Sequence, residues 1–206
     1  RVLRERLGMV ESGIFVPKST ENVAEFMQKW LTTYVATNTA PSTYRGYQGV
    51  IRRYVAPAVG TIAMQNLLPQ HIQAMYADML KRGLNAQTVL HTHRIVREAL
   101  GHAVRWGTLT RNPTDATTPP RPRRKELKMW DVDTIHRFLE AAHYSPFRDL
   151  YHLAVLTGMR RSELLGMMWD NIDLERHQLA VVTTLQRING QGLVVDQPKT
   201  GKSRRS

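Results

Sequence analysis

Apolar side chains recur every three or four positions across the first half of the chain, which is the spacing of an amphipathic helix. One stripe occupies residues 23–34 and follows Ser19 and Thr20, either of which suits a helix N-cap. A second stripe begins near Pro41, because proline suits a first helical turn, and it must stop before Pro57. These patterns predict two successive helices.

Two further helical stripes follow in the same half of the chain. One predicted helix begins at Pro69, and Gly83 lies where a C-terminal cap belongs. The next helix is long, since Asn85 can cap its start and the pattern continues until Gly107. Four helices with short connections predict a compact helical domain, which we place at residues 19–118.

The composition changes at the end of this domain. The stretch RNPTDATTPPRPRRKELK, residues 111–128, is rich in proline, threonine and arginine and lacks apolar periodicity. It indicates an extended connection, and we place the interdomain linker itself at 119–128. Its basic side chains are suited to follow a phosphate backbone. The linker residues selected as DNA contacts are Arg121, Arg123, Arg124 and Lys125.

The last part of the chain, residues 129–206, changes from helical to alternating patterns. The alternating residues predict strands, and NGQG supplies a turn between them. The whole chain is therefore expected to be mainly α-helical with a small antiparallel sheet. The predicted elements are a helix that begins at Asp131 or Asp133, helices over 147–156 and 160–168, and strands over 179–188 and 193–197.

Charge narrows the classes of partner. The formal net charge is +12 and the isoelectric point is about 10.5, which favours a polyanion: DNA, RNA or an acidic membrane surface. No apolar run is long enough to span a membrane. The absence of cysteine excludes disulfides, thiol catalysis and cysteine-bound zinc, and we expect a cytoplasmic, nucleoid-associated protein.

Two motifs in the second half carry candidate chemistry. TGMRRSELLGMMWDNIDL, residues 157–174, sets a threonine-glycine, an arginine and a glutamate at defined spacing before a leucine-rich segment, a tryptophan and an isoleucine-aspartate pair. PKTG, residues 198–201, follows the predicted strands. In these motifs the chain resembles the tyrosine recombinase, or phage integrase, family over about residues 19–206.

The resemblance implies a domain order and a function. It implies a helical core-binding (SAM-like) domain at 19–118, the basic linker, and at 129–206 the N-terminal part of a mixed α/β catalytic domain. Residues 1–18 would be the lead-in from a missing arm-binding domain. The implied activity is site-specific DNA recombination through a phosphotyrosine intermediate, without metal or other cofactor.

The resemblance also implies three catalytic roles. Arg160 would be the first catalytic arginine, Glu163 its acidic partner and Lys199 the general acid. The chemistry fits these residue types: a guanidinium fork matches two phosphate oxygens, and a lysine can protonate a leaving oxygen. From the residues alone, other interpretations stay open. Arg160 or Arg161 can be a solvated arginine at a helix start, Glu163 a capping or surface charge, and Lys199 an ordinary turn residue.

The chain departs from the family pattern in its missing second half. The histidine-x-x-arginine helix and the late tyrosine nucleophile of the family have no counterpart. We therefore expect this chain to bind DNA without cleaving it, and its intact parent to do both. Every tyrosine precedes Lys199, namely Tyr34, Tyr44, Tyr47, Tyr54, Tyr76, Tyr144 and Tyr151.

The polar sides of the second and fourth helices are the predicted face toward a DNA major groove. Serine, threonine and arginine suit contacts to phosphates and base edges, although a solvated helix face would look the same. His91 and His93 are two residues apart on a helix and so are not expected to bind a metal together. The candidate DNA contacts outside the linker are Ser42, Thr43, Arg45, Arg52, Arg53, Thr88, His91, Arg94, Arg97, Arg161 and Lys202.

Three classes of function compete. The first is an integrase of a phage or mobile element that acts on a double-stranded attachment site as a homotetramer, with possible accessory DNA-bending proteins and no membrane. The second is a non-catalytic DNA-binding regulator on the same scaffold. The third, an RNA-binding protein, is disfavoured because the aromatic residues follow core spacing and form no exposed stacking surface.

Overall fold

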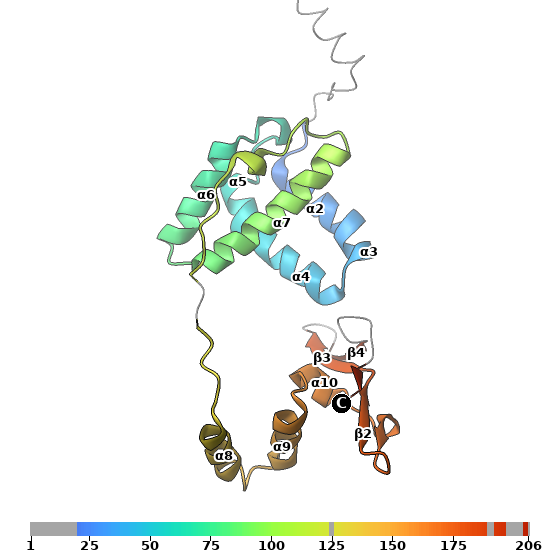
Figure 1. Cartoon of the computed structure of the whole chain (residues 1–206). Coiled ribbons are helices and arrows are strands. Elements are labelled where there is room, and N and C mark those ends of the chain that lie inside the picture. Colours follow the sequence, from blue (N-terminus) through green and yellow to red (C-terminus); the bar gives the residue numbers. More distant parts are fainter. Residues whose placement is uncertain (1–19, 124–125, 189–191, 197–203, 206) are drawn as a thin grey trace, which may run out of the picture. The chain divides into compact units, whose positions relative to one another are not determined.

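The computed structural model describes residues 20–123, 126–188, 192–196 and 204–205. The chain divides after residue 125 into two compact units, shown in Figure 1. This division falls inside the stretch 119–128 that the sequence marks as a linker. We call the described residues 20–123 the helical unit and the described residues from 126 onward the C-terminal unit.

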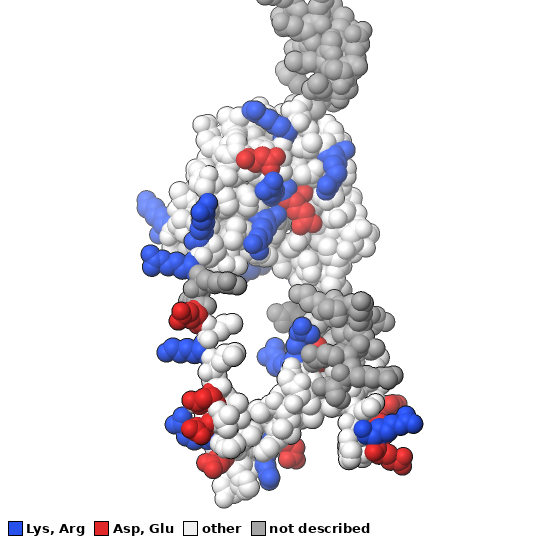
Figure 2. All heavy atoms as spheres, viewed as in Figure 1, with Lys and Arg blue, Asp and Glu red and all other residues white. Residues whose placement is uncertain are grey.

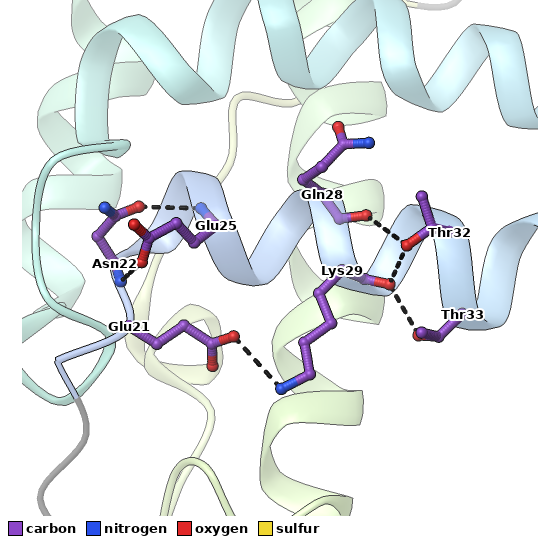
Figure 3. A network of polar contacts seen from close by, with 7 residues as sticks. All are labelled: Glu21, Asn22, Glu25, Gln28, Lys29, Thr32 and Thr33. Carbon is purple, nitrogen blue, oxygen red and sulfur yellow. Dashed lines mark hydrogen bonds and ion pairs between the residues drawn. The ribbon is translucent and has the colours of Figure 1, made fainter.

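The first helix of the helical unit consists of three segments: α2 (Val23–Trp30), a π-helical turn (Leu31–Val35) and α3 (Ala36–Asn38). Its cap is Asn22, not Ser19 or Thr20 as the sequence suggested. The Asn22 side chain accepts from the Glu25 N–H at 2.9 Å, and the Glu25 carboxylate accepts from the Asn22 N–H at 3.0 Å (Figure 3). This reciprocal pair satisfies two N–H groups at once, which a lone serine or threonine cap does not.

The second helix continues past Pro57, where the sequence predicted that it would stop. It comprises α4 (Pro41–Val50), a π-helical turn (Ile51–Val55) and α5 (Ala56–Val59). In the wide turn the N–H of Ala56 bonds to the carbonyl of Ile51, one residue further back than in an α-helix. Proline normally breaks a helix through its ring and its missing N–H. The π-turn just before Pro57 widens the backbone there, and the helix axis continues.

The third and fourth predicted helices are confirmed as α6 (Pro69–Lys81) and α7 (Ala86–Arg105). Asn85 caps α7 by accepting from the Thr88 N–H at 2.8 Å. Gly83 follows α6 with φ of 82°, a left-handed conformation that costs glycine little. Two short 3₁₀ turns complete the unit, at Met64–Asn66 and at η4 (Pro113–Ala116).

The core of the helical unit gathers one face of every helix. Its largest fully buried side chains include Phe26, Trp30, Tyr76 and Leu100. The start of the proline-rich stretch belongs to this unit too, because Pro113 and Thr114 are buried and the N–H of Thr118 donates to the Gln73 side chain at 3.0 Å. The extended connection therefore begins later than residue 111, where the composition changes.

The C-terminal unit contains three α-helices, a 3₁₀ turn and short strands. The prediction of one strand over 179–188 is wrong, since β2 and β3 are separate and pair with different partners. β1 and β5 flank β2, while β3 and β4 form an antiparallel hairpin. The helix predicted over 160–168 is also shorter than expected, because Gly166 ends it. The elements are α8 (Val132–Ala141), α9 (Arg148–Thr157), α10 (Arg161–Leu165), η5 (Trp169–Asn171), β1 (Ile172–Asp173), β2 (Gln178–Val181), β3 (Thr184–Ile188), β4 (Gly192–Asp196) and β5 (Arg204–Arg205).

The strand break and the end of α10 have a common cause. The Thr183 hydroxyl, between β2 and β3, donates to the Gly166 carbonyl. A Cβ added at Gly166 would lie 2.7 Å from the Thr184 Cα, so only glycine permits this approach of two backbones. This contact lies where the chain leaves the sheet that contains β2 and enters the β3–β4 hairpin. As a result, α10 rests on the β3–β4 hairpin.

Candidate active site and nucleic-acid interface

The candidate active site begins where α9 ends. Gly158 adopts φ of 62° and closes α9, after which Met159 is buried and Arg160 is extended with ψ of 149°. This turn reverses from one helix to the next and leaves Arg160 as the residue just before α10. The TGMR sequence thus encodes a helix stop, an apolar anchor and an arginine at the start of the next helix.

Glu163 holds Arg160 by two atoms. Its carboxylate accepts from the Arg160 backbone N–H at 2.9 Å and from Nη1 of the guanidinium at 2.7 Å. The Glu163 side chain is 4% exposed while that of Arg160 is 68% exposed. A buried carboxylate therefore holds part of the guanidinium, and much of the arginine side chain stays open to solvent. Such a group can orient its remaining N–H donors toward an external oxyanion.

Arg161 differs from its neighbour. It is the first residue of α10 and is exposed, and no ion pair of Arg161 occurs among the described residues. The family resemblance pointed to Arg160 as the catalytic arginine, whereas the residues taken alone allowed either arginine to be a solvated one at a helix start. The bond to a buried carboxylate distinguishes Arg160, and the i,i+3 spacing to Glu163 was the signal in the sequence.

Lys199 and Lys202 lie outside the described residues. β4 ends at Asp196, and the β3–β4 hairpin packs against α10 through the contact at Gly166. The element that precedes Lys199 in the chain is therefore joined to the element that carries Glu163.

The candidate DNA contacts of the helical unit fall into two groups. Most are exposed, but Thr88 is half-buried and its hydroxyl donates to the Asn85 side chain at 3.0 Å, so it serves the helix cap. Arg53 donates to the Gly49 carbonyl and lies 5.8 Å from the Tyr54 ring centre. The exposed candidates are Ser42, Arg52, Arg53, His91, Arg94, Arg97, Arg121 and Arg123, and the half-buried ones are Thr43, Arg45 and Thr88. Arg124 and Lys125 lie outside the described residues.

His91 and His93 point to different environments, as their spacing predicted. His91 is exposed, whereas His93 is buried and its Nδ1 lies 2.7 Å from the Tyr76 hydroxyl. Burial is the main reason that the pKa of His93 is lowered, and Arg97 and Arg94 lower it further. Over the described ranges, no group of three His, Cys, Asp or Glu side chains is arranged to hold a metal ion.

Arg105 and Arg111 are not among the candidate contacts predicted from the sequence. Both line a groove with Arg94 and Arg97. The spacing of 94, 97 or 98, 101 and 105 places one row of α7 on a single face, and this pattern could have identified Arg105. Arg111 gave no such signal because its position depends on how the chain folds back after α7.

The helical unit is basic overall. Residues 20–123 contain twelve arginines and lysines against five acidic residues. Figure 2 shows basic side chains with acidic ones between them on the face where α7 runs. No helix within the described residues is both long and apolar enough to cross a membrane. A charge of this sign on exposed helices suits a polyanion.

Comparison with known proteins agrees with the fold. Residues 22–80 match the family described as phage integrase, N-terminal SAM-like domain. An integrase of Saccharopolyspora erythraea is 27% identical over 168 residues, which cover 78% of this chain and 38% of that protein. Residues 22–80 thus carry a phage-integrase SAM-like domain, and the chain is similar to proteins named integrase and tyrosine recombinase.

Two further similarities span most of the chain. A tyrosine recombinase XerC-like protein of Caldanaerobacter subterraneus subsp. tengcongensis is 26% identical over 200 residues, which cover 94% of this chain and 50% of that protein. The solved structure of the Tn1549 transposon integrase with a circular intermediate DNA has a TM-score of 0.80 and 20% identity, and it covers 90% of this chain and 60% of that one. The chain thus has the integrase fold and spans about half the length of the curated relatives it matches.

Proposed function

We propose that this chain is the DNA-binding part, with half of the active site, of a site-specific recombinase that cleaves and rejoins DNA at attachment sites of a phage or mobile element. The observation that carries the proposal is the Arg160–Glu163 arrangement, in which a buried carboxylate orients an exposed guanidinium. The names of the relatives, integrase and tyrosine recombinase, support the reaction class.

The proposed chemistry assigns one task to each residue. A tyrosine oxygen attacks the scissile phosphorus, a 3′-phosphotyrosyl bond forms, and the bond from phosphorus to the 5′-oxygen breaks. Arg160 donates to the non-bridging oxygens as negative charge develops on them. Glu163 positions that guanidinium, and Lys199 gives its proton to the departing 5′-oxygen. Rejoining is the reverse of these steps.

The tyrosine nucleophile is proposed to lie in a longer form of the protein. Among the described residues of the C-terminal unit, Tyr151 packs against the Phe138 and Phe147 rings at 5.4 and 6.5 Å between ring centres, while Tyr144 is almost fully exposed. The other tyrosines belong to the helical unit, and several pack against its core. We infer that this chain binds DNA without cleaving it.

The proposed partner is double-stranded DNA, which the helical unit and the basic linker would hold. The Tn1549 integrase structure, which shares this fold, is a complex with a circular intermediate DNA. Assembly as a homotetramer in a synaptic complex, accessory DNA-bending proteins and a nucleoid location remain part of the same proposal. No cofactor is needed for the steps above.

The test is covalent trapping on a nicked attachment-site duplex. This chain and a longer native form are mixed with the duplex, and denaturing and native gels report adducts and binding respectively. We expect both proteins to bind and only the longer one to form an adduct without metal. In the longer form, Arg160→Ala should reduce adduct formation by about a hundredfold or more. Arg176→Ala, which replaces an exposed arginine of the same unit, is the matched control and should retain most of it.

Two results would contradict the proposal. If neither protein binds duplex DNA, the whole function is wrong. If the longer protein binds but forms no adduct on cognate sites, a non-catalytic DNA-binding regulator on this scaffold becomes the better assignment.

A further inference from the structure

The helical unit has a groove between α7 and the segment that follows it. The groove has a volume of about 650 Å³ and is open to solvent. Four arginines line it: Arg94, Arg97 and Arg105 from α7, and Arg111 from the returning chain. We call it the α7–η4 groove. α7 is the long helix that spans the helical unit in Figure 1.

The two walls of the groove are held together by hydrogen bonds. The Asn112 side chain donates to the Arg97 carbonyl at 3.0 Å, which ties the returning segment to α7. The same side chain accepts from the Thr114 N–H at 3.0 Å and from its hydroxyl at 2.7 Å, and Thr114 is buried. Gly101 lies on the α7 side, where its missing side chain leaves space between the walls. The groove is therefore built by the fold.

The charges in the groove are unbalanced. Asp115 pairs with Arg97 at 3.0 Å, and Glu98 accepts from the Tyr47 hydroxyl at 3.0 Å. Within the part of the chain that the structure describes, no acidic partner is found for Arg94, Arg105 or Arg111. Three guanidinium groups that share one groove repel each other, and an anion between them relieves this repulsion.

We propose that the α7–η4 groove binds phosphate groups of the DNA backbone, with Arg94, Arg105 and Arg111 as the donors. This inference rests on the proposed DNA-binding function and adds a defined phosphate site to it. Guanidinium forks match phosphate oxygens in a bidentate manner. Asp115 holds Arg97 to one wall and lowers the positive potential of the groove.

The concave shape of the groove favours contact with the DNA backbone over contact with DNA base edges. Base edges lie at the bottom of a major groove about 8.5 Å deep, so a protein must insert a protruding element to reach them. A concave site instead receives a protruding group, and the phosphates are the outermost groups of a duplex. The site should therefore contribute salt-dependent affinity that is equal for all sequences.

The experiment compares two double variants of the full chain that each lose two positive charges. Arg105→Gln with Arg111→Gln removes two groove arginines. Lys81→Gln with Arg82→Gln removes two exposed charges at the end of α6, outside the groove, and is the matched control. Affinity for an attachment-site duplex and for a scrambled duplex is measured over a range of salt concentrations. Circular dichroism verifies that each variant is folded.

The groove variant should lose about tenfold or more in affinity on both duplexes, and its salt slope should fall by about two units. The control should change both quantities much less. Asp115→Asn should strengthen binding several-fold, because it raises the potential of the groove. A titration with inorganic phosphate at constant ionic strength distinguishes a site for free phosphate from one for the duplex.

The proposal is overturned if the groove variant and the control lose equal affinity. It is also overturned if the groove variant loses only discrimination between the two duplexes, which would indicate base contacts. Binding of inorganic phosphate at low concentration together with unchanged duplex affinity would assign the groove to free phosphate instead. If the unmodified chain binds neither duplex, the failure lies in the proposed DNA-binding function.

Discussion

Two adjacent arginines differ in their contacts with one buried carboxylate. Arg160 contacts the buried Glu163 through both its backbone and its guanidinium, whereas Arg161 is exposed at the start of α10. Burying a carboxylate is costly unless donors satisfy it, so Glu163 in turn depends on Arg160. The spacing of these two residues in the sequence predicted the pair, and the structure shows that the Glu163 side chain of the pair is buried.

Replacement of Glu163 tests this dependence. Glu163→Ala removes the acceptor of two hydrogen bonds, one of them charged, and should lower the free energy of unfolding by about 1.5–3 kcal/mol. Glu175→Ala is the control, because Glu175 is exposed, and it should change stability by less than about 0.5 kcal/mol. Urea unfolding of the full chain measures both. Equal effects of the two substitutions would show that the pair does not stabilise α10.

Buried histidines make the helical unit sensitive to acid. His93 bonds to Tyr76, and the His102 ring lies 3.9 Å from that of Tyr34 between ring centres. Burial lowers the pKa of both histidines below the ordinary value of 6.5. In the unfolded chain they take up protons at a higher pH than in the folded chain. The stability they contribute is therefore complete above about pH 6.5 and falls as the pH drops toward their lower folded pKa values.

The measurement is urea unfolding at pH 7.5 and at pH 5.5. Stability should be lower at pH 5.5, and the double substitution His93→Gln and His102→Gln should reduce the difference between the two pH values. His91→Gln should leave the difference unchanged, because His91 is exposed. A pH dependence that survives the double substitution would assign the effect to other groups.

At the scale of elements, a π-turn and one close approach of two backbones explain where the sequence predictions were wrong. Proline statistics predicted a stop before Pro57, yet a π-turn carries the helix through it. Alternating residues predicted one strand over 179–188, yet the contact between Gly166 and Thr184 divides it. The local preferences are real. A wider turn in the same helix overcomes the first of them, and a contact with another element overrides the second.

Two glycines give opposite predictions for the same substitution. Gly166→Ala places a Cβ 2.7 Å from the Thr184 Cα, so it should destabilise the C-terminal unit by about 1–3 kcal/mol. Gly46→Ala in α4 meets nothing within 4 Å and should stabilise the chain by about 0.4–1 kcal/mol through reduced backbone freedom in the unfolded state. Thermal unfolding of the two variants measures both effects. Changes of the same sign would contradict the close approach at Gly166.

At the scale of the whole molecule, the apolar core is concentrated in one unit. Of the 26 buried apolar side chains in the described residues, 23 belong to the helical unit. α8 and α9 have no buried residue, and large side chains such as Trp130, Leu156 and Trp169 are exposed. The helical unit thus carries most of the hydrophobic stabilisation.

This distribution predicts that the two units behave differently when separated. A fragment of residues 20–123 should fold alone and unfold in one cooperative urea transition, because its core lies within it. A fragment of residues 126–206 should bind a hydrophobic dye such as ANS more strongly and unfold without a sharp transition. A cooperative transition in the second fragment, or its absence in the first, would contradict this division of stability.

The sequence by itself determined the features that depend on neighbours in the chain. Pro69, Gly83 and Asn85 mark helix ends through their own backbone and side-chain preferences, and the Arg160–Glu163 pair follows from i,i+3 spacing. The basic charge and the family motifs were also identified from the sequence without a structure. The same is true of the helices whose ends these residues mark.

Only the tertiary structure decided features that join distant segments. The α7–η4 groove requires Arg111 to fold back beside Arg94, the division of β2 from β3 requires Gly166 to meet Thr184, and passage through Pro57 requires a π-turn packed within the core. Contacts within one helical turn are set by residues a few positions apart, so sequence patterns reveal them. Contacts between segments depend on how whole elements pack, which no local pattern specifies.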